Sequence, residues 1–280
     1  MAQIIENRAE ICNDICGEVA FLSRKVLDLN KQIIDSEKAK TRFLSLIANE
    51  LNNPMTALLG LIPHLAKQST QPRQDLIDTI EDEALHLDFH IQNLVAATEI
   101  ESGELEISYS LVNLEDLIKE VSKSLKFRMI EKNIKLKVDN HLKQRVVADA
   151  QKLHLILKNL IANACVYGDA DTTIEVTIEQ KDENKLNISV KNYGKEPNVK
   201  HKAQVFTRFA HDLKGIHGLG VGLSVVRELC ERFDGKIDYV VGDNTVTFVV
   251  VLPLETKSAD FEACGSNEFL FESFDDALEL

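Results

Sequence analysis

The chain has 280 residues, a length that accommodates about two domains of 100–200 residues each. Hydrophobic residues make up 44% and charged residues 28%, which is typical of a globular protein. The 32 Lys and Arg residues against 45 Asp and Glu residues give a net charge of −13. This acidity argues against a nucleic-acid-binding protein, because binding to phosphates requires a basic face.

The sequence also predicts no membrane insertion. No apolar run reaches the roughly 18–20 residues that span a bilayer, and acidic residues near the N-terminus argue against a secretory signal. The five cysteines are scattered and predict no disulfide framework. We therefore expect a cytoplasmic protein.

Residues 1–37 carry an apolar repeat of seven residues, which predicts a coiled coil of about four heptads. We interpret Cys12, which lies on the apolar seam, as part of a helix interface, because Cys12 and Cys16 have no second ligand pair for a metal site. The remaining seam positions are Ile5, Ile15, Val19, Leu22, Val26, Leu29 and Ile33.

Residues 38–106 predict a helical hairpin. The apolar pattern continues through Pro54, where we expect a bent helix rather than a stop. The polar stretch 68–72 predicts a turn, and a second amphipathic helix runs from about 75 to 100 and ends at Gly103. With the coiled coil preceding it, this hairpin predicts a homodimer that forms a four-helix bundle.

Residues 107–254 alternate between helical and strand patterns, which predicts a layered α/β sandwich. Helices are expected at 114–127, 150–167 and 224–233, and strands at 134–138, 174–178, 186–190 and 246–252. The tail, residues 255–280, carries eight acids and one lysine. We expect it to be disordered, with its aromatic residues as a possible docking segment.

Two local patterns in this region point to a phosphate ligand. Glycines at 218, 220 and 222 precede a helix, so the backbone can approach a phosphate at the helix N-terminus. Asn159 and Asn163 lie at i and i+4 on one helix face. They are either buried structural residues or a pair of amide oxygens that face the Mg²⁺ of a nucleotide.

Four motifs occur in a fixed order along the chain. They are Asn49-Glu50-Leu51-Asn52-Asn53-Pro54, the Asn159/Asn163 helix, Phe206-Thr207-Arg208-Phe209, and the cluster Gly218, Gly220 and Gly222. Together they resemble the H, N, F and G2 boxes of sensor histidine kinases over about residues 35–254. The resemblance implies a dimerisation and phosphotransfer hairpin followed by a Bergerat-type ATP-binding domain.

The H box departs from the family pattern, because Asn49 stands where the family has its phosphoacceptor histidine. An amide nitrogen has its lone pair delocalised and is not a nucleophile. His64 lies about 22 Å further along a helix and does not replace it. We interpret His86 and His90 as surface or interface residues. Autophosphorylation at this site is therefore expected to fail.

The nucleotide site departs as well. Asn192 replaces the aspartate that, by the resemblance, accepts a hydrogen bond from adenine, and Glu196 replaces a glycine. Val166 stands where many members have a lysine. Residues that match the family's nucleotide site are Asn159, Asn163 (the Mg²⁺ ligand), Tyr167, Gly194, Gly218, Gly220 and Gly222. We expect weak or absent binding of ATP and Mg²⁺.

These observations predict a pseudokinase of two-component signalling. Its surface around Asn49–Asn53 would bind the receiver domain of a response regulator or a partner histidine kinase. One alternative is a response-regulator phosphatase in which Glu50 and Asn53 act, with Asn53 orienting the attacking water. Another is an ATP-dependent histidine kinase with an engineered His-to-Asn change at Asn49, against which Asn192 and Glu196 argue.

Overall fold

The computed structural model is divided into two compact units, the first containing Met1–Ile91 and His211–Gly220 and the second containing Gln92–Ala210 and Val221–Leu280. The predicted site residues Asn49, Glu50 and Gly218, the first half of the predicted coiled coil and the acidic tail lie outside the described residues. The described residues are 21–31, 33–34, 37–38, 44–45, 47–48, 51–63, 73–142, 144–181, 184–197, 202–207 and 220–254.

The first unit is helical at every described residue from 21 to 91. The helix over 51–63 continues through Pro54 and Gly60, as the apolar pattern predicts. Helix α2 (Arg73–Ser102) follows as the second arm of the predicted hairpin, and Gly103 ends it with a φ of +76°. None of the helices in the described ranges combines the length and apolar character needed to cross a lipid bilayer.

The apolar seam of the first unit is open to solvent in the single chain. The seam residues Leu22, Val26, Leu29 and Ile33 are 50–60% exposed. Burial of one such side chain is worth about 1.5–3 kcal/mol. The seam therefore offers a surface for a second helix, in agreement with the heptad pattern.

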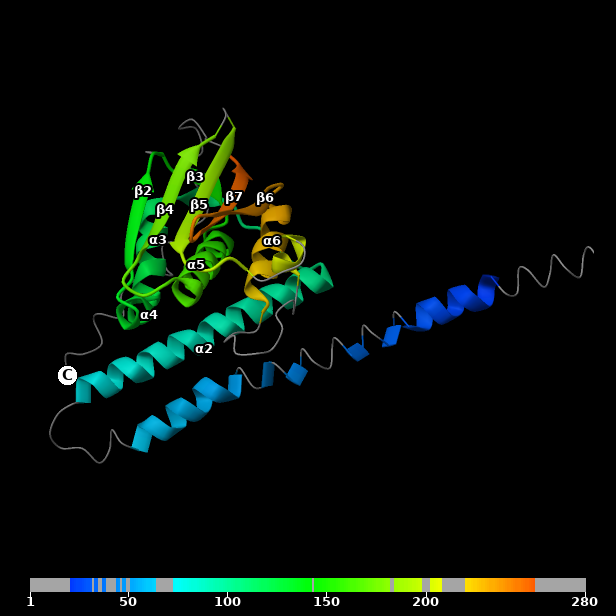
Figure 1. The fold of residues 1–280 in the computed structure, drawn as a ribbon, viewed down its shortest axis with the longest axis horizontal. Helices are drawn as coiled ribbons and strands as arrows, with labels where there is room; N and C mark the ends of the chain where they lie inside the picture. The colour runs from blue at the N-terminus through cyan, green and yellow to red at the C-terminus, as the bar shows by residue number, and fades with distance from the viewer. Residues whose placement is uncertain are drawn as a thin grey trace, which may run out of the picture. The chain divides into compact units, whose positions relative to one another are not determined.

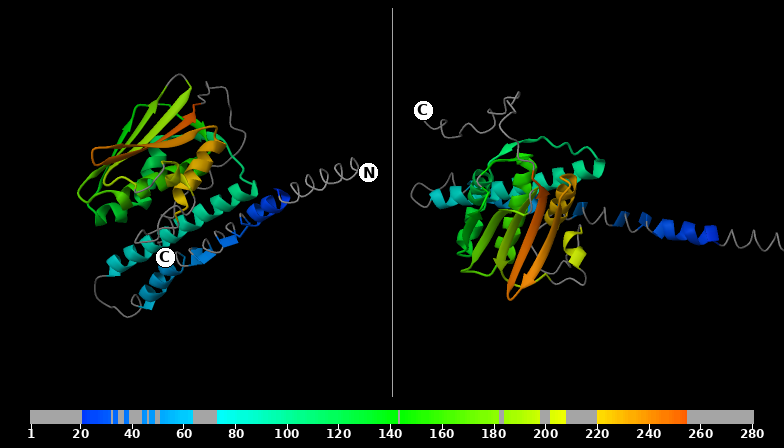
Figure 2. Two further views of the ribbon diagram at one scale, coloured as in Figure 1. Left: turned by 45° about the vertical axis from the view of Figure 1, so that its right-hand side comes forward. Right: turned by 90° about the horizontal axis from the view of Figure 1, so that it is seen from above.

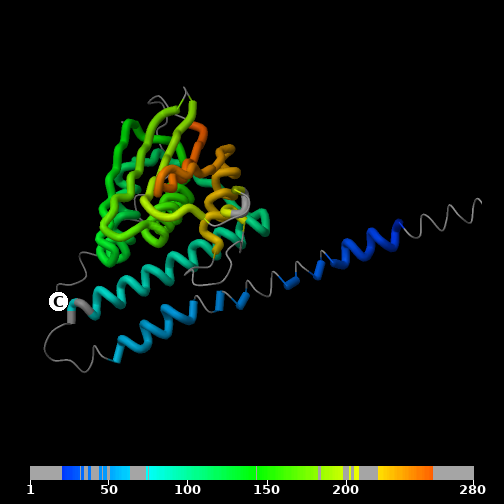
Figure 3. The backbone as a smooth tube through the Cα atoms, in the orientation of Figure 1, coloured from blue at the N-terminus to red at the C-terminus, as the bar shows by residue number. Residues whose placement is uncertain are grey.

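The second unit contains a mixed five-stranded sheet with the order β2-β4-β5-β7-β6 (Figures 1 and 3). β2 and β4 are parallel, and the other neighbours are antiparallel. The strands are β2 (Lys135–Asn140), β4 (Thr173–Gln180), β5 (Lys185–Tyr193), β6 (Lys236–Gly242) and β7 (Thr245–Pro253). A separate antiparallel pair consists of β1 (Ser110–Val112) and β3 (Val146–Ala148).

Helices cover one face of this sheet (Figure 2). α5 contacts β4 and β5, and α6 contacts β6 and β7. The sheet contributes fully buried side chains to the core, such as Ile174, Ile188 and Val250. The helical elements are α3 (Leu114–Ser124), α4 (Lys126–Glu131), α5 (Ala150–Tyr167), the 3-10 helix η1 (Lys202–Phe206) and α6 (Gly222–Arg232).

The predicted order of a helical hairpin followed by an α/β sheet is confirmed, and three details differ. The expected helix over 114–127 is interrupted at Leu125, whose φ and ψ of −109° and 7° separate α3 from α4. The strands β1 and β3 were not predicted, because three residues are too few to show alternation. The edge strand β6 was missed for another reason. Most of its residues are exposed, so buried and exposed residues do not alternate along it.

The start of α5 is fixed by the buried carboxylate of Asp149. Its Oδ1 accepts a hydrogen bond from the Lys152 backbone N–H at 3.0 Å, and its Oδ2 accepts one from the Ser108 N–H at 2.9 Å. Asp149 is 5% exposed. One side chain thus caps the helix and ties it to the segment before β1.

We expect Asp149→Ala to lower the free energy of unfolding by about 2–3 kcal/mol, because it leaves two N–H groups without their partner. Asp149→Asn keeps the oxygen that caps the helix and loses one acceptor, so its cost is expected to be smaller. Urea denaturation followed by circular dichroism measures both. Equal stability of Asp149→Ala and the unsubstituted chain would contradict this role.

Candidate functional site

Asn159 and Asn163 lie one turn apart on α5, yet they have different surroundings. Asn159 is 4% exposed, and its Nδ2 donates to Asn93 Oδ1 at 2.7 Å and to the Leu155 carbonyl at 2.9 Å. A Cβ added to Gly222 would collide with Asn159 Oδ1. Asn163 is partly exposed. The amide of Asn159 is therefore used within the protein, and Asn163 is better placed to offer an oxygen to a cation.

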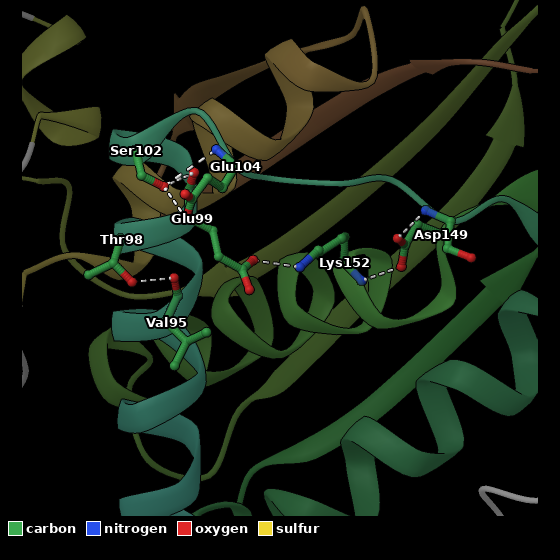
Figure 4. Close-up of polar contacts among 8 residues, drawn as sticks. Val95, Thr98, Glu99, Ser102, Glu104, Asp149 and Lys152 are labelled. Carbon is green, nitrogen blue, oxygen red and sulfur yellow. Dashed lines mark hydrogen bonds and ion pairs between the residues drawn. The ribbon is translucent and has the colours of Figure 1, made fainter.

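The partner residue Asn93 belongs to α2 and was not singled out from the sequence. The last turns of α2 pack in the second unit, where Ala96 and Ala97 are 2% and 1% exposed. Nearby, Glu99 forms an ion pair with Lys152 of α5 at 2.9 Å (Figure 4). Ala96 and Ala97 lie three and four residues after Asn93, on the same side of the helix. Their small size is the sequence signal of the close contact between α2 and α5.

The end of β5 carries the next pair of predicted site residues. Asn192 is 3% exposed, and its Nδ2 has no hydrogen-bond partner among the residues with described side chains. Gly194 lies against α5, because a Cβ at this position would collide with the carbonyl oxygen of Tyr167. The end of α5 and the end of β5 are thus in close backbone contact at Gly194.

The glycine cluster leads into α6. Gly220 has a φ of +63°, a conformation that favours glycine. α6 begins at Gly222, and the N-cap residue Val221 has no side chain that could accept a hydrogen bond from its first N–H groups. These N–H groups carry the partial positive charge of a helix N-terminus and suit an anion.

The residues in the last turn of α5 are uncharged, and the ammonium group of Lys132 lies at this end of the helix. Lys132 donates through its Nζ to the carbonyls of Val166 and Gly168. Its charge is thus placed at the negative end of the α5 dipole. Burial raises the pKa of the Cys165 thiol to about 11, opposed by Arg128 and Lys132, and burial also raises the pKa of Tyr167. Cys165 is therefore a protonated packing residue at neutral pH.

The residues predicted for phosphotransfer lie in the first unit. Asn53 is helical and exposed. His86 and His90 lie one turn apart on α2 with their Nε2 atoms 2.9 Å apart, and the rings meet edge to face. His90 is 7% exposed, so it is buried within the chain and not at its surface.

Two protein families match this arrangement of a helical segment and a sheet unit. Residues 39–103 match the His Kinase A (phospho-acceptor) domain. Residues 148–256 match the histidine kinase-, DNA gyrase B- and HSP90-like ATPase. Together the two matches cover more than half of the chain in the order that the motifs predict.

Known histidine kinases are similar over most of the chain. The circadian input-output histidine kinase CikA of Synechococcus elongatus is 25% identical over 269 residues, which is 89% of this chain and 35% of that protein. The sensor histidine kinase CssS of Bacillus subtilis is 23% identical over 84% of this chain and 51% of that protein. The chain thus spans about a third to a half of these relatives' length.

A solved structure shares the fold. The histidine kinase AdeS of Acinetobacter baumannii superposes with a TM-score of 0.53 at 20% identity, over 74% of this chain and 98% of that structure.

The Asn93–Asn159 contact predicts a measurable coupling. Asn93→Leu leaves one N–H of Asn159 buried without its partner and is expected to cost about 1–3 kcal/mol of unfolding free energy. The double variant Asn93→Leu/Asn159→Leu is expected to cost less than the sum of the single variants, by about 1 kcal/mol. Denaturant melts of the four proteins give this value. Asn93→Asp keeps the acceptor oxygen and serves as the control; strict additivity would contradict the coupling.

Proposed function

The chain belongs to the histidine kinase family of two-component signalling proteins, and we propose that within this family it is a pseudokinase that does not phosphorylate itself. The observation that carries the proposal is Asn49, which precedes Glu50 and Leu51 inside the segment that matches the phospho-acceptor domain. The lone pair of its amide nitrogen is delocalised into the carbonyl. It cannot attack a phosphoryl group as an imidazole nitrogen does.

The proposed activity is binding through the helical hairpin. The surface around residues 49–53 binds the receiver domain of a response regulator, or the chain pairs with a partner histidine kinase. The exposed apolar residues of the first unit support a homodimer, because they are available to a second helix. They include the coiled-coil seam and Leu44, Leu59 and Ile62, which are 58%, 64% and 51% exposed.

We assign four segments on this basis. Residues 1–37 form the coiled coil, 38–106 the dimerisation hairpin, 107–254 the ATP-binding-type domain and 255–280 the acidic tail. The family matches at 39–103 and 148–256 support the two middle segments. We place the protein in the cytoplasm, where response regulators reside.

Nucleotide is proposed as a regulatory ligand that binds weakly with Mg²⁺. Several features fit it: the buried Asn192 Nδ2, which has no hydrogen-bond partner among the described residues, the close backbone approach at Gly194, and the N-terminus of α6, where Val221 offers no side-chain cap. Asn163 would hold the Mg²⁺, and Tyr167 would flank the nucleotide. When bound, ATP can supply a phosphoryl group. A hydrogen bond accepted by the neutral Asn192 is weaker than one accepted by a carboxylate, by about 1 kcal/mol. Glu196 adds a negative charge nearby in the sequence.

A second candidate function is dephosphorylation of a response regulator. It is favoured by Asn53, an exposed amide on the helix over 51–63 and three residues after Glu50. An amide at this position can orient a water molecule toward a phosphorylated aspartate of the receiver domain. This chemistry does not need a nucleophilic nitrogen at position 49.

The first experiment is incubation of the purified chain with γ-labelled ATP at saturating concentration. We expect no phosphoryl label on the unsubstituted chain and acid-labile label on Asn49→His. The control is Asn52→His, which places an imidazole nearby on the same helix but not at the predicted acceptor position, and it is expected to stay unlabelled. Label on the unsubstituted chain would refute the pseudokinase proposal.

The second experiment measures loss of phosphate from receiver domains phosphorylated with acetyl phosphate. A phosphatase is expected to speed this loss, and Asn53→Ala to reduce the acceleration by about 100-fold or more, the typical contribution of a positioned catalytic group. Asn52→Ala is the matched control. If the receiver domain binds but its phosphate decays at the spontaneous rate, the chain binds without acting as a phosphatase.

A further inference from the structure

Residues 123–137 form a strongly basic segment in a chain that is acidic as a whole. They include five lysines, one arginine and one glutamate, a net charge of +5, whereas the whole chain carries −13. Lys123 and Lys126 are exposed, and neither has an ion-pair partner among the described side chains. Lys119, one turn before Lys123 on α3, differs because it pairs with Glu115 at 3.1 Å.

Helix α4 presents apolar side chains to solvent within this basic segment. Phe127 and Ile130 are 45% and 64% exposed, whereas Met129 is 7% exposed and packs in the core. Lys126 and Phe127 lie four and three residues before Ile130, so these three side chains share one side of the helix. We call Lys123, Lys126, Phe127 and Ile130 the α4 surface.

The acidic tail has the complementary composition. Residues 255–280 carry eight acids and one lysine, a net charge of −7. Their last part, residues 268–280, contains five acids, no basic residue and three phenylalanines. An acidic segment with aromatic side chains matches a basic surface with exposed apolar side chains in both charge and apolar character.

Two other exposed apolar places in the second unit lie in acidic segments. Val240 of β6 is 60% exposed, and residues 231–243 around it contain four acids and two basic residues. Tyr109 is 61% exposed, and residues 104–116 around it contain four acids and no basic residue. Like charges repel the tail from both places. Of these three places, the α4 surface is the one that attracts it.

The tail is long enough to reach the α4 surface. β7 ends at Pro253, at the opposite end of the sheet from Lys135, the first residue of β2, and β5 and β4 lie between these strands. From the spacing between strands and the rise along them, this distance is about 30 Å. The Ile134 N–H donates to the Met129 carbonyl at 2.7 Å, which ties α4 to the start of β2. Residues 255–267 span up to about 43 Å when extended.

We propose that residues 268–280 bind the α4 surface of the same chain, with their carboxylates at Lys123 and Lys126 and their phenylalanine rings on Phe127 and Ile130. Because the tail is joined to the unit that it binds, its effective concentration is in the millimolar range, and individually weak contacts suffice. The bound tail lies beside β2, an edge strand of the sheet, and shields it from pairing with another chain. The inference does not depend on the proposed function.

The test uses the full chain, which has no tryptophan of its own, so one introduced tryptophan reports on its surroundings. Phe127→Trp places the reporter on the α4 surface, and Tyr109→Trp is the control at another exposed aromatic residue. Acrylamide quenching is compared between the original tail and the tail variant Phe269→Ser/Phe271→Ser/Phe274→Ser. We expect the tail variant to raise the quenching constant about twofold with Phe127→Trp and to leave it unchanged with Tyr109→Trp.

A second comparison tests the charges. In the Phe127→Trp chain, Lys126→Gln is expected to raise the quenching constant in the same direction as the tail variant. Lys119→Gln is the matched control, because this ammonium group already pairs with Glu115, and it is expected to change nothing. Raising NaCl to about 0.5 M is expected to act like Lys126→Gln, because salt screens the attraction. Thermal unfolding checks that each variant is folded.

Each other outcome overturns the proposal in a distinct way. Equal quenching with both tails in folded Phe127→Trp shows that the tail does not bind there. An equal effect of the tail variant with Tyr109→Trp shows that the tail does not select the α4 surface. Protection that rises with protein concentration assigns the surface to a second copy of the chain. Protection that appears only with phosphatidylserine vesicles, with either tail, assigns it to an anionic membrane.

Discussion

Helix α5 is fixed by polar contacts at its start, its middle and its end, and the geometry of the candidate site depends on this fixation. Asp149 caps its first turn, the Asn93–Asn159 hydrogen bond holds its centre, and Lys132 binds the carbonyls at its end. Each contact joins α5 to a different element of the second unit. Because the residues between these contacts are almost all buried, α5 cannot shift without losing packing as well.

The sequence predicted elements whose signal is local and periodic. The strands β2, β4, β5 and β7 were recognisable because apolar residues alternate along them, and α5 because nearly every position is apolar. The break at Leu125 and the short pair β1 and β3 were not predictable, since backbone angles at one residue and pairings of three residues leave no period in the sequence.

The candidate site was predictable in composition but not in how its groups are used. The spacing of Asn159 and Asn163 places them on one helix face, which the structure confirms. The spacing does not reveal that Asn93, 66 positions away, accepts a hydrogen bond from the amide of Asn159. Likewise, the sequence identifies Asn192 as a departure from a family pattern, whereas only the structure shows that its Nδ2 has no hydrogen-bond partner among the described residues.

Gly194 and Gly222 show why a glycine motif does not by itself indicate that a ligand binds. At both positions a methyl group would collide with an oxygen of α5, the Tyr167 carbonyl in one case and the Asn159 amide in the other. At Gly194 the obstacle is a backbone oxygen, so packing disfavours replacement there, and at Gly222 a replacement requires the Asn159 side chain to move. A chain of this fold that had lost its affinity for nucleotide would still have a packing reason to keep both glycines, so the loss of such a pocket is better followed through residues such as Asn192, whose Nδ2 has no hydrogen-bond partner among the described residues.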